Sequence, residues 1–419
     1  MGIIVQKFGG TSVADVAKMH NVASAAIREK NKGNDVVIVV SAMGHTTDYL
    51  VKMAKDITET PDSREMDMLL STGEQVSIAL LTMAIQSHGY DAISMNGQQV
   101  GIITECIHTK ARILDVKTDT LKKNISEGKI VVVAGFQGVT PDGEITTLGR
   151  GGSDTSAVAI AAALDAERCD IYTDVEGIYT TDPRIVPTAK KLDVVSYEEM
   201  LELARVGANV LHPRSVETAK QFKVPVRVRS SFELDNLGTL IIGVNDMEIY
   251  KPVAGVAADT SQVRIVICQV PDAPGTSAKI FSKLADNNIS VDMIIQSYGR
   301  TNDTNDIAFT VDEKDFDSAL EIMQGVKDEL GATEILVDND IAKVSIVGAG
   351  MVDRPGIAAE MFKALADIGI NIKMIATSEI KISCLVEKGK EKEAIKALCE
   401  KFNLQTDEMA VVHGDLPNV

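Results

Sequence analysis

The stretch that decides the fold is Lys7-Phe8-Gly9-Gly10-Thr11-Ser12, which follows the apolar run Gly2-Ile3-Ile4-Val5. This order predicts a strand that ends in a lysine, a turn on two glycines and the start of a helix. Free N–H groups at a helix start and a nearby ammonium favour anions, and paired glycines let the backbone approach a phosphate closely. The alternative is an ordinary tight strand-to-helix turn with a surface lysine. It is not a Walker A loop, because Lys7 precedes the glycines.

Outward from this turn, apolar β-branched runs alternate with helical patterns as far as about residue 243. The expected strands are Ile3–Lys7, Val36–Ser41, Ala92–Met95, Ile130–Ala134, Asp170–Thr173 and Val226–Arg229. The expected helices include Val13–Glu29, Arg64–Ser87, Asp154–Leu164, Tyr197–Ala204 and Pro213–Gln221. Short apolar strands separated by helices predict an α/β fold with a mainly parallel sheet that helices cover on both faces. Ligands bind at the carboxyl ends of such strands, where the glycine-rich motifs fall.

The composition is that of a soluble globular protein, with 45% hydrophobic and 24% charged residues. A chain of 419 residues is too long for a single hydrophobic core and indicates about two to four domains. A net charge of −18 argues against nucleic acid and anionic membranes as partners. No apolar run has the length of a membrane span, and no secretory signal is visible. The five widely spaced cysteines indicate buried free thiols in a reducing cytoplasm, and the six histidines predict no metal site.

The last third of the chain contains an internal repeat. Pro274–Ser297 aligns without gaps on Pro355–Ser378, and each copy follows a β-branched strand. The order strand-helix-strand-strand-helix predicts two ferredoxin-like units, at 261–340 and 341–419, after a linker at 244–260. The alternative is a duplicated scaffold that binds no ligand.

Four further segments of the first 230 residues carry polar or glycine-rich motifs. They are Val40–Asp48, Ser71-Thr72-Gly73-Glu74, Thr146–Ser156 and Tyr172–Arg184. Glycine destabilises a helix interior, so Gly73 indicates either close packing or a ligand amine beside Glu74. Thr47, Ser153 and Asp154 also suit plain helix caps. Arg150 has no capping role, and its planar guanidinium suits a carboxylate.

These motifs together favour phosphoryl transfer, which needs positioning and cancellation of phosphate charge more than a protein nucleophile. Lys7, glycine-rich backbone amides and Mg²⁺ would neutralise the phosphates. Glu74 and Arg150 would recognise the α-amino and α-carboxylate groups of an amino acid.

The chain resembles the aspartate kinases of the amino-acid kinase family, and specifically the monofunctional, allosterically regulated ones. KFGGTSV, VVSAMG, STGE, TTLGRGGSDTSA, YTDVEGIYTTDPR, LHPRSVE and VPVRVRSS occur in family order, so the resemblance covers essentially the whole chain. It implies an αβα catalytic domain at 1–243, and the C-terminal repeat resembles two ACT domains, at 261–340 and 341–419. It also implies MgATP-dependent phosphorylation of the L-aspartate β-carboxylate to 4-phospho-L-aspartate, the first step toward lysine, threonine, methionine and, in bacteria, diaminopimelate.

The resemblance also implies roles for individual residues. Lys7 would stabilise the transferring phosphoryl group, while Asp154 and Ser153 would organise the centre between the substrates. Aspartate would be bound by Thr47, Glu74 and Arg150, with Arg150 on the α-carboxylate. The nucleotide and its phosphates would be held by Lys7, Gly9, Gly10, Thr11, Ser41, Thr173, Asp174, Tyr179 and Arg184. Where some members have lysine, this chain has Asn209, so a nucleotide contact there is in doubt.

The ACT pair implies feedback by lysine, threonine or both. The effector contacts would be Asp272, Gln296, Ser378 and Glu379, often between subunits. The open edge of each ACT sheet favours pairing with another copy, or with a separate ACT-only subunit made from an internal start at Met247. Two alternatives remain: a glutamate or acetylglutamate kinase, and an amino-acid sensor whose kinase domain is inactive.

Overall fold

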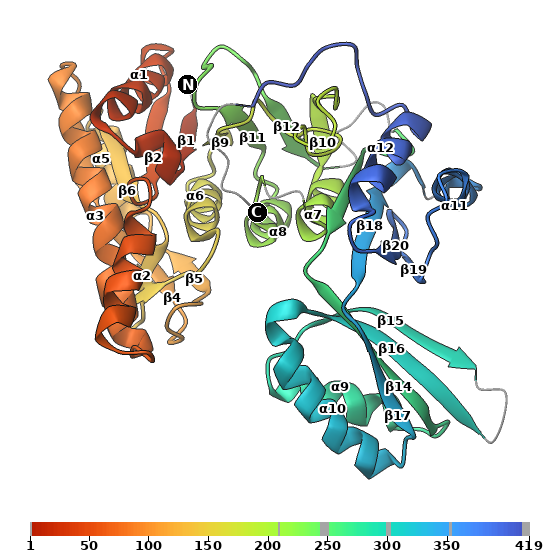
Figure 1. The fold of residues 1–419 in the computed structure, drawn as a ribbon. Helices are drawn as coiled ribbons and strands as arrows, with labels where there is room; N and C mark the ends of the chain where they lie inside the picture. Colours follow the sequence, from red (N-terminus) through yellow and green to blue (C-terminus); the bar gives the residue numbers. More distant parts are fainter. Residues whose placement is uncertain (1, 208–209, 244–250, 299–302, 352–353, 413–419) are drawn as a thin grey trace.

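The computed structural model describes residues 2–207, 210–243, 251–298, 303–351 and 354–412 (Figure 1). The N-terminal part is built on an eight-stranded sheet in the order β10-β12-β11-β9-β1-β2-β6-β3. These strands are β1 Ile3–Phe8, β2 Asp35–Val40, β3 Ala92–Met95, β6 Ile130–Ala134, β9 Arg168–Thr173, β10 Val194–Ser196, β11 Val226–Ser230 and β12 Thr239–Ile242. Their pairs are parallel except β11 with β12. The predicted mainly parallel sheet is confirmed.

Alternate side chains of each central strand face opposite layers, and both layers are aliphatic. Val36, Ile38 and Val40 pack with α1 (Val16–Asn31) and α3 (Ser63–Ser87). Val37 and Val39 pack on the other face. That face is covered by α5 (Asp119–Ser126), α6 (Gly152–Ala163), α7 (Tyr197–Arg205) and α8 (Pro213–Phe222). Burial on both sides explains why these strands are apolar throughout.

The sequence pattern did not predict a second, smaller sheet, whose strand β8 packs against α3. Its order is β5-β4-β7-β8, with bounds β5 Ile113–Val116, β4 Ile102–Thr104, β7 Gln137–Val139 and β8 Ile145–Thr147. The short helices α2 (Thr46–Ile57) and α4 (Gly97–Val100) complete this region. Helix α3 is long and apolar enough to cross a membrane, but half of its most apolar window is buried inside the protein. Its contacts with α1, β3 and β6 explain that apolar character as core packing.

The C-terminal part forms two four-stranded sheets, and both units have the order strand-helix-strand-strand-helix that the repeat predicts. The fourth strand follows this order in the first unit and precedes it in the second. The first has the order β15-β16-β14-β17, from β14 Gln262–Pro271, α9 Thr276–Asp286, β15 Val291–Tyr298, β16 Thr304–Asp312, α10 Phe316–Leu330 and β17 Glu334–Asp338. The second has the order β13-β18-β20-β19. It comprises β18 Ile341–Val347, α11 Ile357–Asp367, β19 Met374–Thr377, β20 Lys381–Glu387 and α12 Glu391–Lys401.

The fourth strand of the second ACT sheet corrects the expected linker. Residues 244–260 were expected to connect two domains, but Gly255–Asp259 form β13. This strand pairs antiparallel with β18, placing Val256 opposite Ile346. The first ACT domain is therefore inserted between two adjacent strands of the second. Met247 lies outside the described residues.

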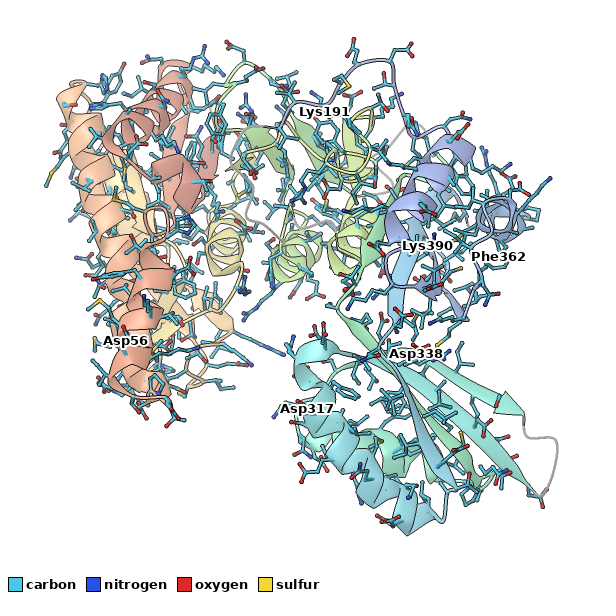
Figure 2. The ribbon with its side chains drawn as sticks, viewed as in Figure 1. Asp56, Lys191, Asp317, Asp338, Phe362 and Lys390 are labelled. Carbon is cyan, nitrogen blue, oxygen red and sulfur yellow. The ribbon has the colours of Figure 1, made fainter. Side chains whose placement is uncertain are left out.

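Ion pairs join the two ACT sheets where they meet. Asp338, labelled in Figure 2 at the end of β17, bonds Arg264 of its own domain at 3.0 Å and Lys373 of the second domain at 3.1 Å. Lys343 is almost fully buried and pairs with Asp292 at 2.6 Å. Met293 and Met374 pack together beside these pairs. The ACT domains therefore have a packed contact within one chain.

Candidate active site

The glycine-rich turn after β1 has two glycines with different surroundings. A Cβ on Gly10 would lie 2.7 Å from the Ala42 carbonyl oxygen, so a side chain is excluded there. A Cβ on Gly9 would meet only the Lys7 ammonium, at 3.5 Å. Gly10 is thus required by packing within the protein, whereas Gly9 leaves open space beside a cation.

Lys7 forms an ion pair with Asp154 in the first turn of α6, with Nζ 2.6 Å from Oδ1. Their side chains are 12% and 11% exposed. The pair joins the carboxyl end of β1 to the amino end of α6. An ammonium there is partly neutralised yet remains accessible to a ligand anion.

Glu74 lies in the middle of α3 and faces the same region. Gly73 packs on Ala42, because a Cβ at Gly73 would come within 2.8 Å of the Ala42 Cβ. This approach lets Glu74 Oε1 accept a hydrogen bond from Ala42 N at 3.0 Å, while Oε2 is buried without a hydrogen-bond partner. Burial raises the pKa of Glu74 to about 7. Close packing, one of the two explanations for Gly73, is therefore confirmed.

The turn before α6 presents Arg150 between two left-handed glycines. Gly149 has φ of 76° and Gly151 of 68°. Gly151 is also the N-cap of α6, so Ser153 and Asp154 lie inside the helix and do not cap it. Thr47 likewise lies in the first turn of α2, whose N-cap is His45. Arg150 is exposed and, within the described ranges, has no hydrogen-bonded or ion-paired partner.

A cavity of about 550 Å³ brings these groups together. Among the residues that line it are Lys7, Ser41, Thr47, Asp48, Glu74, Thr109, Thr147, Arg150, Ser153 and Asp154. A carboxylate and a guanidinium on separate walls suit a small zwitterion, and a lysine is available for a phosphoryl group.

A second cavity, of about 340 Å³, lies beyond the carboxyl end of β9. Its polar wall contains four of the nine residues expected to hold the nucleotide and its phosphates: Thr173, Asp174, Tyr179 and Arg184. Its other walls come from α7, β13, α12 and the described segment after α12, including Leu203, Val256, Ala257, Ile395 and Val412. The second ACT domain thus supplies apolar surface to this cavity.

The segment after α12 is tied to the loop that carries the polar wall. Leu404 O accepts hydrogen bonds from Thr180 Oγ1 at 2.6 Å and from Lys190 N at 3.1 Å. Thr406 N donates to Thr188 O at 2.8 Å, and Val412 forms a bridge with Val175. This connection fixes the loop against the ACT domain.

The sequence profile of the amino acid kinase family matches residues 2–230, and that of the ACT domain matches 263–325 and 344–402. Aspartokinase 2 of Bacillus subtilis strain 168 is 53% identical over 411 residues, which are 98% of this chain and 100% of that protein. The chain belongs to the aspartokinase family. It is an enzyme that phosphorylates aspartate at the expense of ATP, as the resemblance implies.

Two solved aspartokinase structures share the whole architecture. Escherichia coli aspartokinase III in complex with aspartate and ADP (R-state) is 28% identical, with a TM-score of 0.79 over 95% of this chain and 99% of that one. The same enzyme in complex with lysine and aspartate (T-state) is 28% identical, with a TM-score of 0.73 over 96% and 99%. The expected αβα fold with ACT domains is confirmed for this aspartokinase.

The structure distributes the expected site residues of this aspartokinase between the two cavities, with exceptions. Gly9, Gly10 and Thr11 lie on the turn after β1 but line neither cavity. Asp272, Gln296, Ser378 and Glu379 are exposed on the ACT domains, away from both cavities. Asn209 lies outside the described residues. Of the five cysteines, Cys106 is exposed, so the expectation that all are buried is wrong for it.

Sequence reasoning missed several wall residues of this aspartokinase. Thr109, with a left-handed φ of 66°, lines the larger cavity from a loop without a recognisable motif. Thr147 belongs to the quoted motif Thr146–Ser156, but it was assigned no role there. The walls from β13 and the chain end had no signal, because they depend on domain packing.

Proposed function

We propose that the 550 Å³ cavity binds L-aspartate and that the 340 Å³ cavity binds ATP. The supporting observation is the order of the strands. β1 and β9 are parallel neighbours, with Phe8 opposite Tyr172. Lys7 and the nucleotide loop therefore lie at the same edge of the sheet, so a phosphoryl group has a short path between the two sites.

Aspartate is held through its charged groups in this proposal. Arg150 binds the α-carboxylate, and Glu74 accepts a hydrogen bond from the α-ammonium through its free Oε2. Thr47 and Ser153 complete the contacts from the starts of α2 and α6. The β-carboxylate then points toward Lys7.

The nucleotide contacts follow the second cavity and the turn after β1. Thr173, Asp174, Tyr179 and Arg184 bind the nucleoside side of ATP. The phosphates extend toward Lys7, Gly9, Gly10, Thr11 and Ser41. The open space beside Gly9 supports close approach of a phosphate to the backbone.

The chemical step needs no nucleophile from the protein. A β-carboxylate oxygen of aspartate forms a bond to the γ-phosphorus of ATP as the bond to the bridging oxygen breaks, and ADP leaves. Lys7 stabilises charge on the transferring group, Asp154 holds Lys7 in place, and Arg150 fixes the attacking substrate.

The site suits a Mg²⁺ ion that is held by few protein side chains. Magnesium is usually held by one or two carboxylates together with substrate phosphates. In the part of the chain that the structure describes, no group of three or more His, Cys, Asp or Glu side chains is suited to a metal. Asp154, the buried carboxylate beside Lys7, is the side chain that would hold the ion. When bound, Mg²⁺ neutralises phosphate charge.

Regulation by lysine, threonine or both acts through the ACT domains in this proposal. Asp272, Gln296, Ser378 and Glu379 are accessible to an effector or to a second subunit. Open sheet edges favour a homo-oligomer, or association with an ACT-only subunit that starts near Met247. The enzyme works in the cytoplasm, where ATP and aspartate are available.

The deciding experiment measures ADP release with MgATP and L-aspartate, while hydroxylamine traps the acyl phosphate. Lysine, threonine and both together are then added. Aspartate-dependent turnover that falls with these amino acids supports the site and its regulation. Turnover with glutamate or acetylglutamate in place of aspartate would contradict the assigned substrate.

A further inference from the structure

Two loops form one wall of the aspartate cavity. One is the segment 105–112, which contributes Thr109; the other is the turn 146–151, which contributes Arg150. They lie against each other, with Ala111 N donating to Thr147 O at 3.0 Å. A Cβ on Gly149 would lie 3.1 Å from Thr109 O. The position of Arg150 therefore depends on how both loops are held.

From one side the loops are held by Asp67 of α3, which is fully buried. Asp67 accepts hydrogen bonds from Thr109 N at 3.0 Å and from the Thr147 hydroxyl. Its Oδ2 also lies 2.9 Å from His108 Nδ1. Asp67 precedes Glu74 by about two helical turns, so both carboxylates project from one face of α3.

From the other side the loops are held by Arg214 in the first turn of α8. Its guanidinium donates to Leu148 O at 2.9 Å and to Ala111 O at 2.6 Å. Leu148 belongs to the turn and Ala111 to the loop, so one planar group bonds both. The neighbouring His212 packs on the turn, because a Cβ on Gly151 would overlap its imidazole.

Asp67 and Arg214 thus bind the same two loops from opposite sides, and neither lines the cavity. Hydrogen bonds to charged groups are stronger than those between neutral groups, so these contacts favour one arrangement of the two loops. The segment Leu211-His212-Pro213-Arg214 has no other role in the proposed chemistry.

We propose that Asp67 and Arg214 are positioning residues that orient Arg150, and hence set the affinity for aspartate without touching it. This inference rests on the proposed contact between Arg150 and the α-carboxylate. It assigns to the His-Pro-Arg segment a function in substrate recognition, transmitted through Leu148 and Ala111.

The test compares Asp67→Asn and Arg214→Met in the full-length enzyme by steady-state kinetics. Asn keeps the size of Asp67 but loses its charge, and Met keeps much of the length of Arg214. The expected result is an increase of roughly tenfold in the KM for aspartate, with the KM for ATP unchanged within about twofold. Arg214→Lys, which keeps one donor group, should recover part of the loss.

Control variants lie on the same helices. Thr82→Val on α3 replaces a buried hydroxyl that has no hydrogen-bond partner, and Lys220→Met on α8 removes an exposed ion pair with Glu198. Both should keep the KM for aspartate. Equal increases in both KM values, or a fall in melting temperature with both KM values unchanged, would overturn the positioning role.

A double-mutant cycle separates this inference from the proposed function. If Asp67 acts through Arg150, adding Asp67→Asn to Arg150→Ala should raise the KM for aspartate no further. A further multiplicative increase would overturn the inference. Should Arg150→Ala alone leave the KM for aspartate unchanged, the proposed role of Arg150 fails, and the positioning role fails with it. If Arg150→Ala raises the KM for aspartate but neither Asp67→Asn nor Arg214→Met does, the positioning role is overturned while the proposed role of Arg150 stands.

Discussion

The two cavities differ in where their walls come from. The larger cavity, which we propose binds aspartate, is built from residues between Lys7 and Asp154, all within the kinase domain. The nucleotide cavity takes its polar wall from the loop after β9 and much of its apolar wall from β13, α12 and the chain end. Tyr179 and Val186 of the nucleotide loop belong to the same hydrophobic core as the second ACT domain.

This difference shows which substrate a regulatory domain can influence directly. A shift of the second ACT domain would move Val256 or Ile395 and so change the shape of the nucleotide cavity. Among the described residues, none that lines the larger cavity comes from an ACT domain. Feedback transmitted through packed contacts should therefore act first on ATP binding. It should act on aspartate binding only through the Lys7–Asp154 pair, which we propose meets both substrates.

The largest effect is expected at that shared pair. Lys7→Ala should lower kcat by about 10²–10³, because it removes charge stabilisation that strengthens during transfer. The KM for aspartate should stay within about threefold. Steady-state kinetics with both substrates varied checks this, with Lys7→Arg as the charge-conserving control. A large rise in the KM for aspartate with an unchanged kcat would contradict this role, because it would mean that Lys7 only binds aspartate.

The next effect isolates the aspartate cavity. Arg150→Ala should raise the KM for aspartate about 10- to 100-fold, since a charge-assisted contact contributes about 1.5–3 kcal/mol. The KM for ATP should change little. Isothermal titration calorimetry with aspartate and with ATP separately compares the two affinities without turnover. Equal weakening of both ligands would show that the two cavities are not independent.

The pH dependence offers a third way to sharpen the comparison. The pKa of Glu74 is raised to about 7 by burial, so its proton is taken up as the pH falls through that value. Aspartate affinity should therefore weaken by roughly tenfold between pH 8 and pH 6, while ATP affinity follows its own profile. Glu74→Gln should remove this inflection. Folding stability should fall as the pH rises from about 4.5 to 7, because the native state holds the proton more tightly.

The smallest effect concerns the nucleotide cavity. A chain that ends at Leu404 loses the hydrogen bond of Thr406 to Thr188 and the bridge of Val412 to Val175. Loss of about 1 kcal/mol of net interaction should raise the KM for ATP roughly fivefold. The aspartate KM is the internal control. An unchanged ATP KM would mean that the chain end only covers the loop and does not shape the cavity.

Local patterns predicted much of the kinase sheet because its strands are buried on both faces. Ala92–Met95 and Ile130–Ala134 were predicted with the bounds that the structure gives. The strands Gln137–Val139 and Ile145–Thr147 are short and partly polar, so they have no comparable signal. The strand Gly255–Asp259 is defined by a partner far along the chain.

The same contrast applies to the site. Lys7, Thr173 and Asp174 stand at the ends of parallel strands, and topology alone places such residues together. Arg150 and Asp154 flank a helix start with a recognisable glycine pattern. Asp67 of α3 and Arg214 in the first turn of α8 form hydrogen bonds with groups of two distant loops. Nothing in the local sequence of either residue indicates its hydrogen-bond partners, because tertiary packing determines them.

The insertion of one ACT domain between β13 and β18 has a consequence for synthesis on the ribosome. Residues 260–340 must emerge before β13 meets its partner, which takes on the order of ten seconds at typical elongation rates. The inserted domain can fold during that delay, while β13 remains an unpaired edge. A shorter product that starts near Met247 still contains β13, whereas one that starts beyond Asp259 would leave β18 exposed on one side.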